Sequence, residues 1–220
     1  MKEVTISSDE LLGTSLESSL SHQRGNRATR VPAILEVAIN VFATHGNGGF
    51  TQRRIADEAG IRLRTLQHYF STREELLRES VAKMVRRYLE GFQEIANDKS
   101  RSPESSLDAI LDESISILLD PNSVAGASSL HLWSLAEQED FARELVRDLF
   151  GEYQEMFEGL VARMNPTLAP QECGLRAALL VSNLLGLVVY IRRSAENIPD
   201  VEKFRHATKV VFRTLCKAPQ

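Results

Sequence analysis

Apolar side chains recur at every third or fourth position along most of this 220-residue chain, which is the spacing of one face of an α-helix. In residues 28–46 they fall at Ile34, Val37, Ala38, Val41 and Phe42, and Gly46 follows as a helix-ending signal. The alternation of apolar and polar positions that is typical of strands is not convincing anywhere. The pattern therefore predicts an all-α protein of about nine helices.

The later helices can be placed in the same way. A short helix is expected after Thr51, which caps it, and ends at Gly60; a second short helix covers residues 63–69. Ser71 or Thr72 then caps a long helix with two glutamates in its first turn, where the helix dipole favours acids. Further helices are predicted over residues 103–120, 123–138, 140–164, 172–196 and 201–217. Residues 1–23 lack aromatic residues and sustained periodicity, so we expect a flexible tail there.

The two short helices on either side of Gly60 have the pattern of a helix-turn-helix, in which two helices meet steeply across a glycine turn. Gly60 can adopt the left-handed conformation that ends the first helix, and Ala56 is small enough for the second helix to cross closely. The residues expected on the buried side are Ile55, Ala56, Ala59, Ile61, Leu63 and Leu66.

Polar side chains are left on the outer side of the second short helix. They are Arg62, Arg64, Thr65, Gln67, His68 and Tyr69. Arginine can pair bidentately with guanine in the major groove, and glutamine can pair in the same way with adenine. Hydroxyl groups such as those of Thr51, Thr65 and Tyr69 suit phosphate oxygens. The second helix is therefore predicted to recognise duplex DNA.

The charge distribution fits this prediction. The formal net charge is −4, yet residues 24–73 hold eight arginines and only three acids. A basic segment on an acidic body is the electrostatic pattern of a small nucleic-acid-binding unit, although a cluster of solvated arginines would give the same count.

Other classes of protein are disfavoured by what the sequence lacks. The two cysteines are too few and too far apart for a disulfide framework or a metal knuckle. His131 and Glu137 have no nucleophile, phosphate loop or third orienting group near them, so we expect no enzyme, metal or cofactor. The N-terminus is not a signal peptide, and the apolar run at 177–191 is shorter than the ~20 residues that span a bilayer. These features predict a cytoplasmic protein.

Residues 30–76 resemble the DNA-binding domain of TetR-family transcriptional repressors. The matching segments are RVPAILEVAINVFATHG, FTQRRIADEAGI, RTLQHYF and STREEL. The resemblance implies phosphate contacts at Thr51, Thr65, Tyr69 and, in place of the usual lysine, Arg73. The family commonly has a small residue where Arg62 and Arg64 stand and tyrosine where Gln67 stands, so we interpret these three as this chain's own specificity determinants. The predicted DNA-binding residues are Thr51, Arg53, Arg62, Arg64, Thr65, Gln67, His68, Tyr69 and Arg73.

The resemblance also implies that residues 74–220 form a larger helical domain that binds a small effector and dimerises, after a DNA-binding domain at 24–73. Candidate pocket residues are Met84, Tyr88, Phe92, His131, Trp133 and Met156, although such residues at helical spacing are more often core than pocket.

The apolar run at 177–191 predicts a dimer interface more directly. It is apolar nearly all round, so a helix there needs cover from its own domain on one side and from a second subunit on the other. A buried central helix in a monomer is the alternative. The candidate interface residues are Leu180, Leu184, Leu187, Phe204, Ala207, Val211 and Leu215.

Together these features predict a homodimeric, sequence-specific DNA-binding regulator. The resemblance implies a repressor that a small-molecule effector releases from its operator, with the long helix from Arg73 as the physical link between the two domains. A ligand-independent activator and a helical protein-interaction module of the same fold are the alternatives.

Overall fold

The computed structural model describes residues 27–219, and within them the protein consists of nine α-helices and one short 3-10 turn, with no strand. The all-α prediction is confirmed; the predicted tail at 1–23 lies outside the described residues. The helices are α2 (Arg27–Gly49), α3 (Gln52–Glu58), α4 (Leu63–Tyr69), α5 (Arg73–Asn97), α6 (Pro103–Leu119), α7 (Val124–Ala136), α8 (Asp140–Met164), α9 (Pro170–Ser194) and α10 (Val201–Lys217), with the 3-10 turn at Ala195–Asn197.

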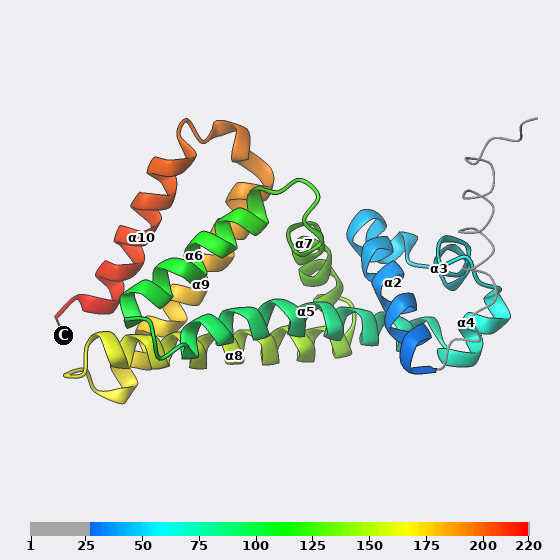
Figure 1. The fold of residues 1–220 in the computed structure, drawn as a ribbon, viewed down its shortest axis with the longest axis horizontal. Helices are drawn as coiled ribbons and strands as arrows, with labels where there is room; N and C mark the ends of the chain where they lie inside the picture. The colour runs from blue at the N-terminus through cyan, green and yellow to red at the C-terminus, as the bar shows by residue number, and fades with distance from the viewer. Residues whose placement is uncertain (1–26, 220) are drawn as a thin grey trace, which may run out of the picture.

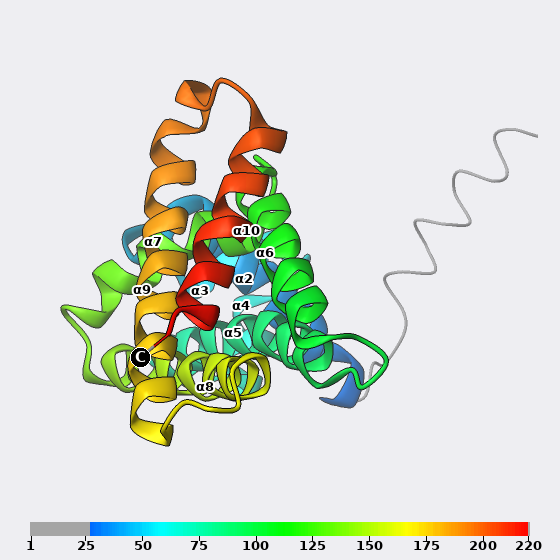
Figure 2. The ribbon, with the colours of Figure 1, turned by 90° about the vertical axis from the view of Figure 1, so that its left-hand side faces the viewer.

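Helices α2, α3 and α4 form a small unit at one end of an elongated molecule (Figure 1). Helix α5 leaves this unit and runs beside α8 along the length of the protein. Helices α6, α9 and α10 stand at the opposite end, and Figure 2 shows α9 and α10 together on that end face. Helix α7 lies between the two ends and packs against both α2 and α8.

Side-chain caps fix the starts of the helices where the sequence predicts them. The Thr51 hydroxyl accepts a hydrogen bond from the Arg54 backbone N–H at 3.2 Å, so Thr51 is the cap of α3. Thr72, and not Ser71, caps α5 by accepting from the Glu75 N–H at 3.0 Å. The Glu75 carboxylate in turn accepts from the Ser71 backbone N–H at 2.8 Å, in the manner of a capping box.

Two glycines adopt the left-handed conformation that their positions require. Gly46 has φ 60° at a kink in α2, and Gly60 has φ 64° at the corner between α3 and α4. Both were predicted as helix-ending positions. At Gly60 the chain turns so that the Ile61 N–H donates to the Ala56 carbonyl at 3.0 Å, which closes the C-terminal end of α3 before α4 begins at Leu63.

Three buried clusters hold the protein together. The first joins the α2–α4 unit to the start of α5, to α7 and to the start of α8, so the small unit is not packed separately. The second and third fill the space among α5, α6, α8, α9 and α10. The predicted inner face of α4 is correct for Leu66, which is fully buried, but wrong for Leu63, whose side chain is 38% exposed.

Helix α9 is the one segment of residues 27–219 that is long and apolar enough to cross a membrane by length and composition. In the structure it packs against α8, and its Cys173, Ala177 and Leu180 lie in the second core cluster. The helix also carries Arg176, whose buried guanidinium donates to the Ala218 carbonyl at 2.6 Å. These contacts make α9 a core helix with one exposed side.

Candidate DNA-binding surface and ligand cavity

Helix α4 displays polar side chains at the end of the molecule while a few apolar residues anchor it. Leu66 and Phe70 are buried in the first core cluster. On the outer side Arg62, Arg64, Gln67 and His68 are all exposed, as the sequence predicts. Thr65 and Tyr69 are half-buried. The arrangement has the form of a recognition helix, with base-reading side chains facing away from the core.

The arginines of this surface carry charge that the protein itself leaves unpaired. Within residues 27–219 the guanidinium groups of Arg53, Arg62 and Arg64 form no ion pair or hydrogen bond. Exposed and unpaired cations on two neighbouring helices attract a polyanion such as a phosphate backbone.

Arg73 is placed differently from its predicted phosphate contact. Its Nε donates to the Phe50 carbonyl at 2.8 Å, and one terminal nitrogen donates to the Asn47 carbonyl at 2.7 Å. Its guanidinium also lies 5.8 Å from the Phe50 ring centroid. Arg73 therefore fixes the loop that precedes α3, and its hydrogen-bonding capacity is largely used within the protein.

Two further positioning contacts were not predicted. The Gln52 amide donates to the Phe70 carbonyl at 2.9 Å, which ties the start of α3 to the end of α4. Arg54 donates to the Gly49 carbonyl at 3.1 Å and holds the loop between α2 and α3. Both acceptors are backbone carbonyls, which leave no signal in the sequence.

His68 and Tyr69 form an aromatic pair at the end of α4. Their ring centroids are 5.4 Å apart with an interplanar angle of 66°. The Tyr69 ring packs against the first core cluster, while its half-exposed side chain forms no hydrogen bond within the described range. Packing of the ring and a phosphate contact by the hydroxyl are therefore compatible.

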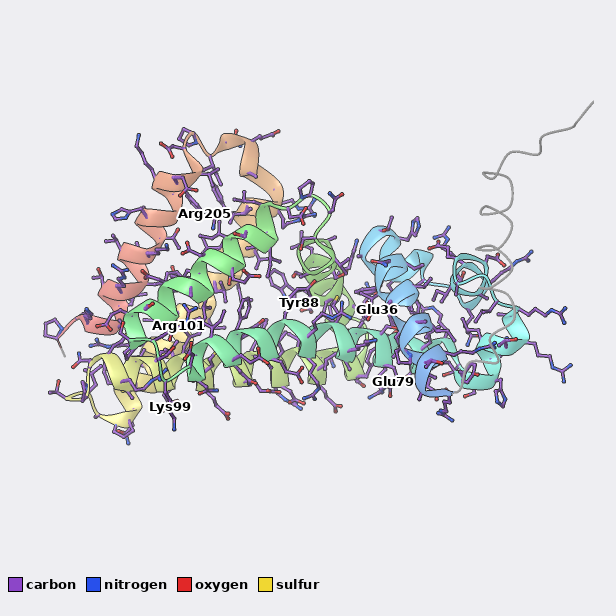
Figure 3. All side chains as sticks on the ribbon, viewed as in Figure 1. Glu36, Glu79, Tyr88, Lys99, Arg101 and Arg205 are labelled. Atoms are coloured by element: carbon purple, nitrogen blue, oxygen red, sulfur yellow. The ribbon has the colours of Figure 1, made fainter. Side chains whose placement is uncertain are left out.

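The larger part of the protein contains an apolar cavity of about 110 Å³ among α5, α6, α7, α8 and α9. Four of the six predicted pocket residues line it: Met84, Tyr88, Phe92 and Trp133. Tyr88 rises from α5 toward the space beside α7 (Figure 3). The other lining residues include Ser114, Ser129, Leu149, Phe150 and Tyr153. Burial raises the pKa of Tyr153 to about 12.

His131 and Met156 do not line this cavity. His131 lies on the opposite side of α7, where its ring meets the edge of Phe42 at 6.0 Å and covers Gly46. Met156 packs against the second core cluster from α8. Periodicity alone does not tell which neighbour a helix face meets, so the sequence could not place these two residues relative to the cavity, and their effector contact stays a prediction. The cavity residues of α8 were missed, although Leu149, Phe150 and Tyr153 share one helical face.

The end face formed by α9 and α10 was predicted to dimerise, but the structure changes which residues it offers. Leu180 and Leu184 lie in the protomer's own core, and Leu187, Phe204 and Leu215 are half-buried. Ala207 and Val211 are exposed. The exposed large apolar side chains of the two helices are Leu175, Leu179, Val189, Tyr190, Val210 and Val211. We call these six residues the α9–α10 face.

Both cysteines are buried free thiols, and burial raises the pKa of Cys216 to about 11. No cluster of three or more metal-ligating side chains occurs among residues 27–219.

Comparison with known proteins agrees with this architecture. Residues 34–80 match the family model described as bacterial regulatory proteins, tetR family. The chain is 27% identical over 179 residues to the HTH-type transcriptional regulator BetI of Agrobacterium fabrum, covering 80% of this chain and 82% of that protein.

Solved structures give the same fold at lower identity. A transcriptional regulator from Rhodococcus sp. Rha1 superposes with a TM-score of 0.72 at 22% identity, covering 85% of this chain and 96% of that one. A TetR transcription regulator from Haloarcula marismortui gives a TM-score of 0.70 at 17% identity, covering 87% and 98%. The regulator FadR from Bacillus subtilis, solved with stearoyl-CoA, gives 0.61 at 17% identity, covering 86% and 98%. The helix-turn-helix geometry, the match over residues 34–80 and these relatives together support a TetR-family transcriptional regulator.

Proposed function

We propose that the protein is a cytoplasmic, homodimeric repressor that binds a near-palindromic operator through α4 and is released by a small molecule in the apolar cavity. The observation that carries this proposal is the outer side of α4, where Arg62, Arg64 and Gln67 are exposed on a helix anchored by buried residues. Residues 24–73 then act as the DNA-binding domain, and residues 74–220 bind the effector and the second subunit.

The chemistry of the side chains divides the DNA contacts into two kinds. Arg62, Arg64 and Gln67 can pair with base edges, since each presents two donors or a donor and an acceptor in one plane. The exposed and half-buried residues around them are assigned to the phosphate backbone, and such contacts fix the register of the helix without reading sequence. These phosphate-contacting residues are Thr51, Arg53, Thr65, His68 and Tyr69.

Release by an effector is supported by the two helices that border both the cavity and the DNA-binding unit. Helix α5 lines the cavity with Tyr88 and connects directly to α4, while α7 lines it with Trp133 and packs its His131 against α2. A ligand shifts an equilibrium only by its differential affinity for two states. Because a ligand in the cavity touches both helices, it can favour one separation of the two recognition helices over another.

Dimerisation follows from the same geometry. A regulator with two recognition helices reads two major grooves when they are separated by about 34–36 Å, one turn of DNA. The α9–α10 face supplies the apolar surface that a second copy could cover. The solved neighbour FadR was crystallised in complex with stearoyl-CoA, which supports ligand binding as a role for this fold.

The proposal is tested with DNA selected from a random pool by the full chain, followed by fluorescence anisotropy on the selected duplex and a scrambled duplex. Gln67→Ala is expected to weaken specific binding by ~1–3 kcal/mol, because one bidentate base contact is lost, and to leave scrambled binding unchanged. Gln171→Ala is the matched control, since Gln171 is exposed at the start of α9, away from α4.

Each alternative gives a different result. Equal weakening of both duplexes by Gln67→Ala contradicts the base-reading role. An affinity that does not fall with salt indicates a protein-interaction module, because phosphate contacts release counterions. Specific binding that no effector reduces indicates a ligand-independent activator.

A further inference from the structure

The cavity among α5, α6, α7, α8 and α9 has a lining whose chemistry restricts what it can hold. Every residue that lines it is apolar or a neutral aromatic, hydroxyl or thioether side chain, and among residues 27–219 no Asp, Glu, Lys, Arg or His contributes to the wall. An ion transferred into such a site loses its hydration without gaining an opposite charge. The aromatic rings could attract a cation, but no carboxylate is present to neutralise it.

From this lining we infer that the effector is a small neutral molecule, a single ring or an aliphatic group of similar size, that carries a hydrogen-bond acceptor. The inference rests on the proposed function, because it names the ligand of the proposed regulatory site. It excludes carboxylates and quaternary or primary ammonium compounds as the group bound inside the cavity.

The size follows from the volume. The cavity holds about 110 Å³, which is of the same order as the ~150 Å³ engineered protein cavity that binds benzene. One six-membered ring therefore matches the space without a large rearrangement of the wall.

The acceptor follows from the hydrogen bonds of the wall. Ser114 and Ser129 each donate their hydroxyl proton to a carbonyl one turn earlier, at 2.7 Å, so these two donors are already used. The hydroxyls of Tyr88 and Tyr153 form no hydrogen bond in the described part of the chain. A protonated phenol has one O–H donor, and this O–H can donate a hydrogen bond to a carbonyl, ether or hydroxyl oxygen of a ligand.

The cavity shares part of its wall with a surface groove on α7, α8 and α9. Trp133, Phe150 and Leu185 line both the cavity and a neighbouring surface groove that also includes Glu137 and Gly186. The carboxylate of Glu137 lies in the groove and not in the cavity wall, so it does not supply the missing counter-charge inside.

Trp133 makes the test direct, because it is the only tryptophan of the chain and it lines the cavity. The full-length protein without DNA is titrated at pH 7 with four ring compounds of similar size while tryptophan fluorescence is recorded. The compounds are toluene, acetophenone, benzoate and benzylammonium. We expect acetophenone to bind with a dissociation constant at least ten times lower than either charged compound. Equal or tighter binding of benzoate or benzylammonium overturns the inference, as does the failure of both neutral compounds to bind.

Two conservative variants test the hydrogen bond separately. Tyr88→Phe combined with Tyr153→Phe keeps both rings, so it is expected to weaken acetophenone about three- to tenfold and to leave toluene unchanged. Tyr190→Phe, on the exposed α9–α10 face, is the matched control and should change neither. An unchanged affinity for acetophenone in the double variant contradicts the role of the phenols.

The same compounds added to the protein–operator complex distinguish this inference from the proposed function. If a neutral compound changes the Trp133 fluorescence but does not release the operator, the inferred ligand class is supported and the proposed release by an effector is contradicted. If a charged compound releases the operator and neither neutral compound binds, the proposed release by an effector is supported and the inferred neutral ligand class is contradicted.

Discussion

The His131 side chain of α7 covers the kink of α2, where its Nδ1 lies 2.9 Å from the point that a Cβ would occupy at Gly46. Only a glycine leaves room for this ring, and only a glycine adopts φ 60° there without strain. The contact joins the DNA-binding unit to a helix whose other side lines the ligand cavity. The glycine at the kink therefore serves two purposes: it ends the regular part of α2, and it lets α7 pack closely against α2.

Gly46→Ala is therefore expected to destabilise the protein. The backbone at φ 60° and ψ −165° costs a residue with a Cβ about 1–3 kcal/mol, and the overlap with His131 adds to this. At roughly 2–4 °C per kcal/mol for a chain of this size, thermal unfolding should show a loss of several degrees. Gly48→Ala is the control, because nothing lies within 4 Å of a Cβ at Gly48.

The double variant Gly46→Ala with His131→Ala separates the two contributions. Removal of the ring relieves the overlap but not the backbone strain, so we expect Gly46→Ala to cost less stability in the His131→Ala background than in the natural protein, but still to cost some. Equal stability of Gly46→Ala and the natural protein would show that α2 and α7 can separate at this point without cost.

Arg73 and Arg53 are expected to behave in opposite ways. Arg73 donates to the carbonyls of Asn47 and Phe50, so Arg73→Ala should lower the free energy of unfolding in urea by ~1.5–3 kcal/mol. Arg53 is exposed and unpaired, so Arg53→Ala should leave stability unchanged and reduce the slope of log affinity for DNA against log salt by about 1. If Arg73→Ala instead left stability unchanged and reduced the salt dependence of DNA binding, the result would support the phosphate contact that the sequence predicts for Arg73.

Much of the fold could be predicted because each helix carries its own boundaries. Pro103 and Ser102 begin α6 where the sequence places it, and the structure ends that helix at Leu119, one residue before the predicted 120. Thr51 caps α3, and Gly60 closes the corner of the helix-turn-helix. Caps and left-handed glycines act within a few residues, so they are readable from the local sequence.

The errors concern contacts between elements. Helix α4 has only two turns, too few for periodicity to exclude Leu63 from the buried face. Arg73 bonds backbone carbonyls 23 and 26 residues earlier, and such acceptors have no residue signature. Helix α9 is apolar nearly all round, so its sequence does not tell which side meets the core, and the structure buries Leu180 while it exposes Leu179.

The pairing of α2 with α5 through Glu36 is expected to depend on pH. The Glu36 carboxylate accepts from Lys83 at 2.9 Å and also pairs with Arg87. The hydrogen bond from Lys83 is the main cause that lowers the pKa of Glu36 below its ordinary value of 4.5. A carboxylate with a lowered pKa in the folded state stabilises the protein above the ordinary value, and this stabilisation is lost as the pH falls through the folded-state pKa.

Glu36→Gln should consequently reduce stability near pH 7 and have little effect at pH 3. Because the Glu36 side chain is 44% exposed, solvent screening limits the difference to roughly 0.5 kcal/mol. Urea unfolding at pH 7, 5 and 3 measures it. Glu79→Gln is the control, since Glu79 is exposed on α5 and forms no ion pair in the described range; both residues are labelled in Figure 3. A loss that is the same at every pH would assign the effect of Glu36 to packing.

The α9–α10 face provides the last prediction. Leu179 is 45% exposed on α9 and Val210 is 48% exposed on α10, and Figure 2 shows both helices on one end of the molecule. A fully buried side chain of this kind stabilises an interface by ~1.5–3 kcal/mol, and a charge in its place must lose its hydration unpaired. The double variant Leu179→Lys with Val210→Lys should therefore dissociate the dimer.

Sedimentation equilibrium measures the outcome directly. We expect the natural chain at twice its 24.6 kDa mass and the double variant at 24.6 kDa, with retained helicity. Ala162→Lys, on the exposed side of α8, is the control and should stay dimeric. The dissociated variant should also lose specific operator binding, because a monomer places only one recognition helix in a groove and cannot span two half-sites. A natural chain of 24.6 kDa in solution, or a double variant that remains dimeric, would show that the α9–α10 face is not the dimer interface.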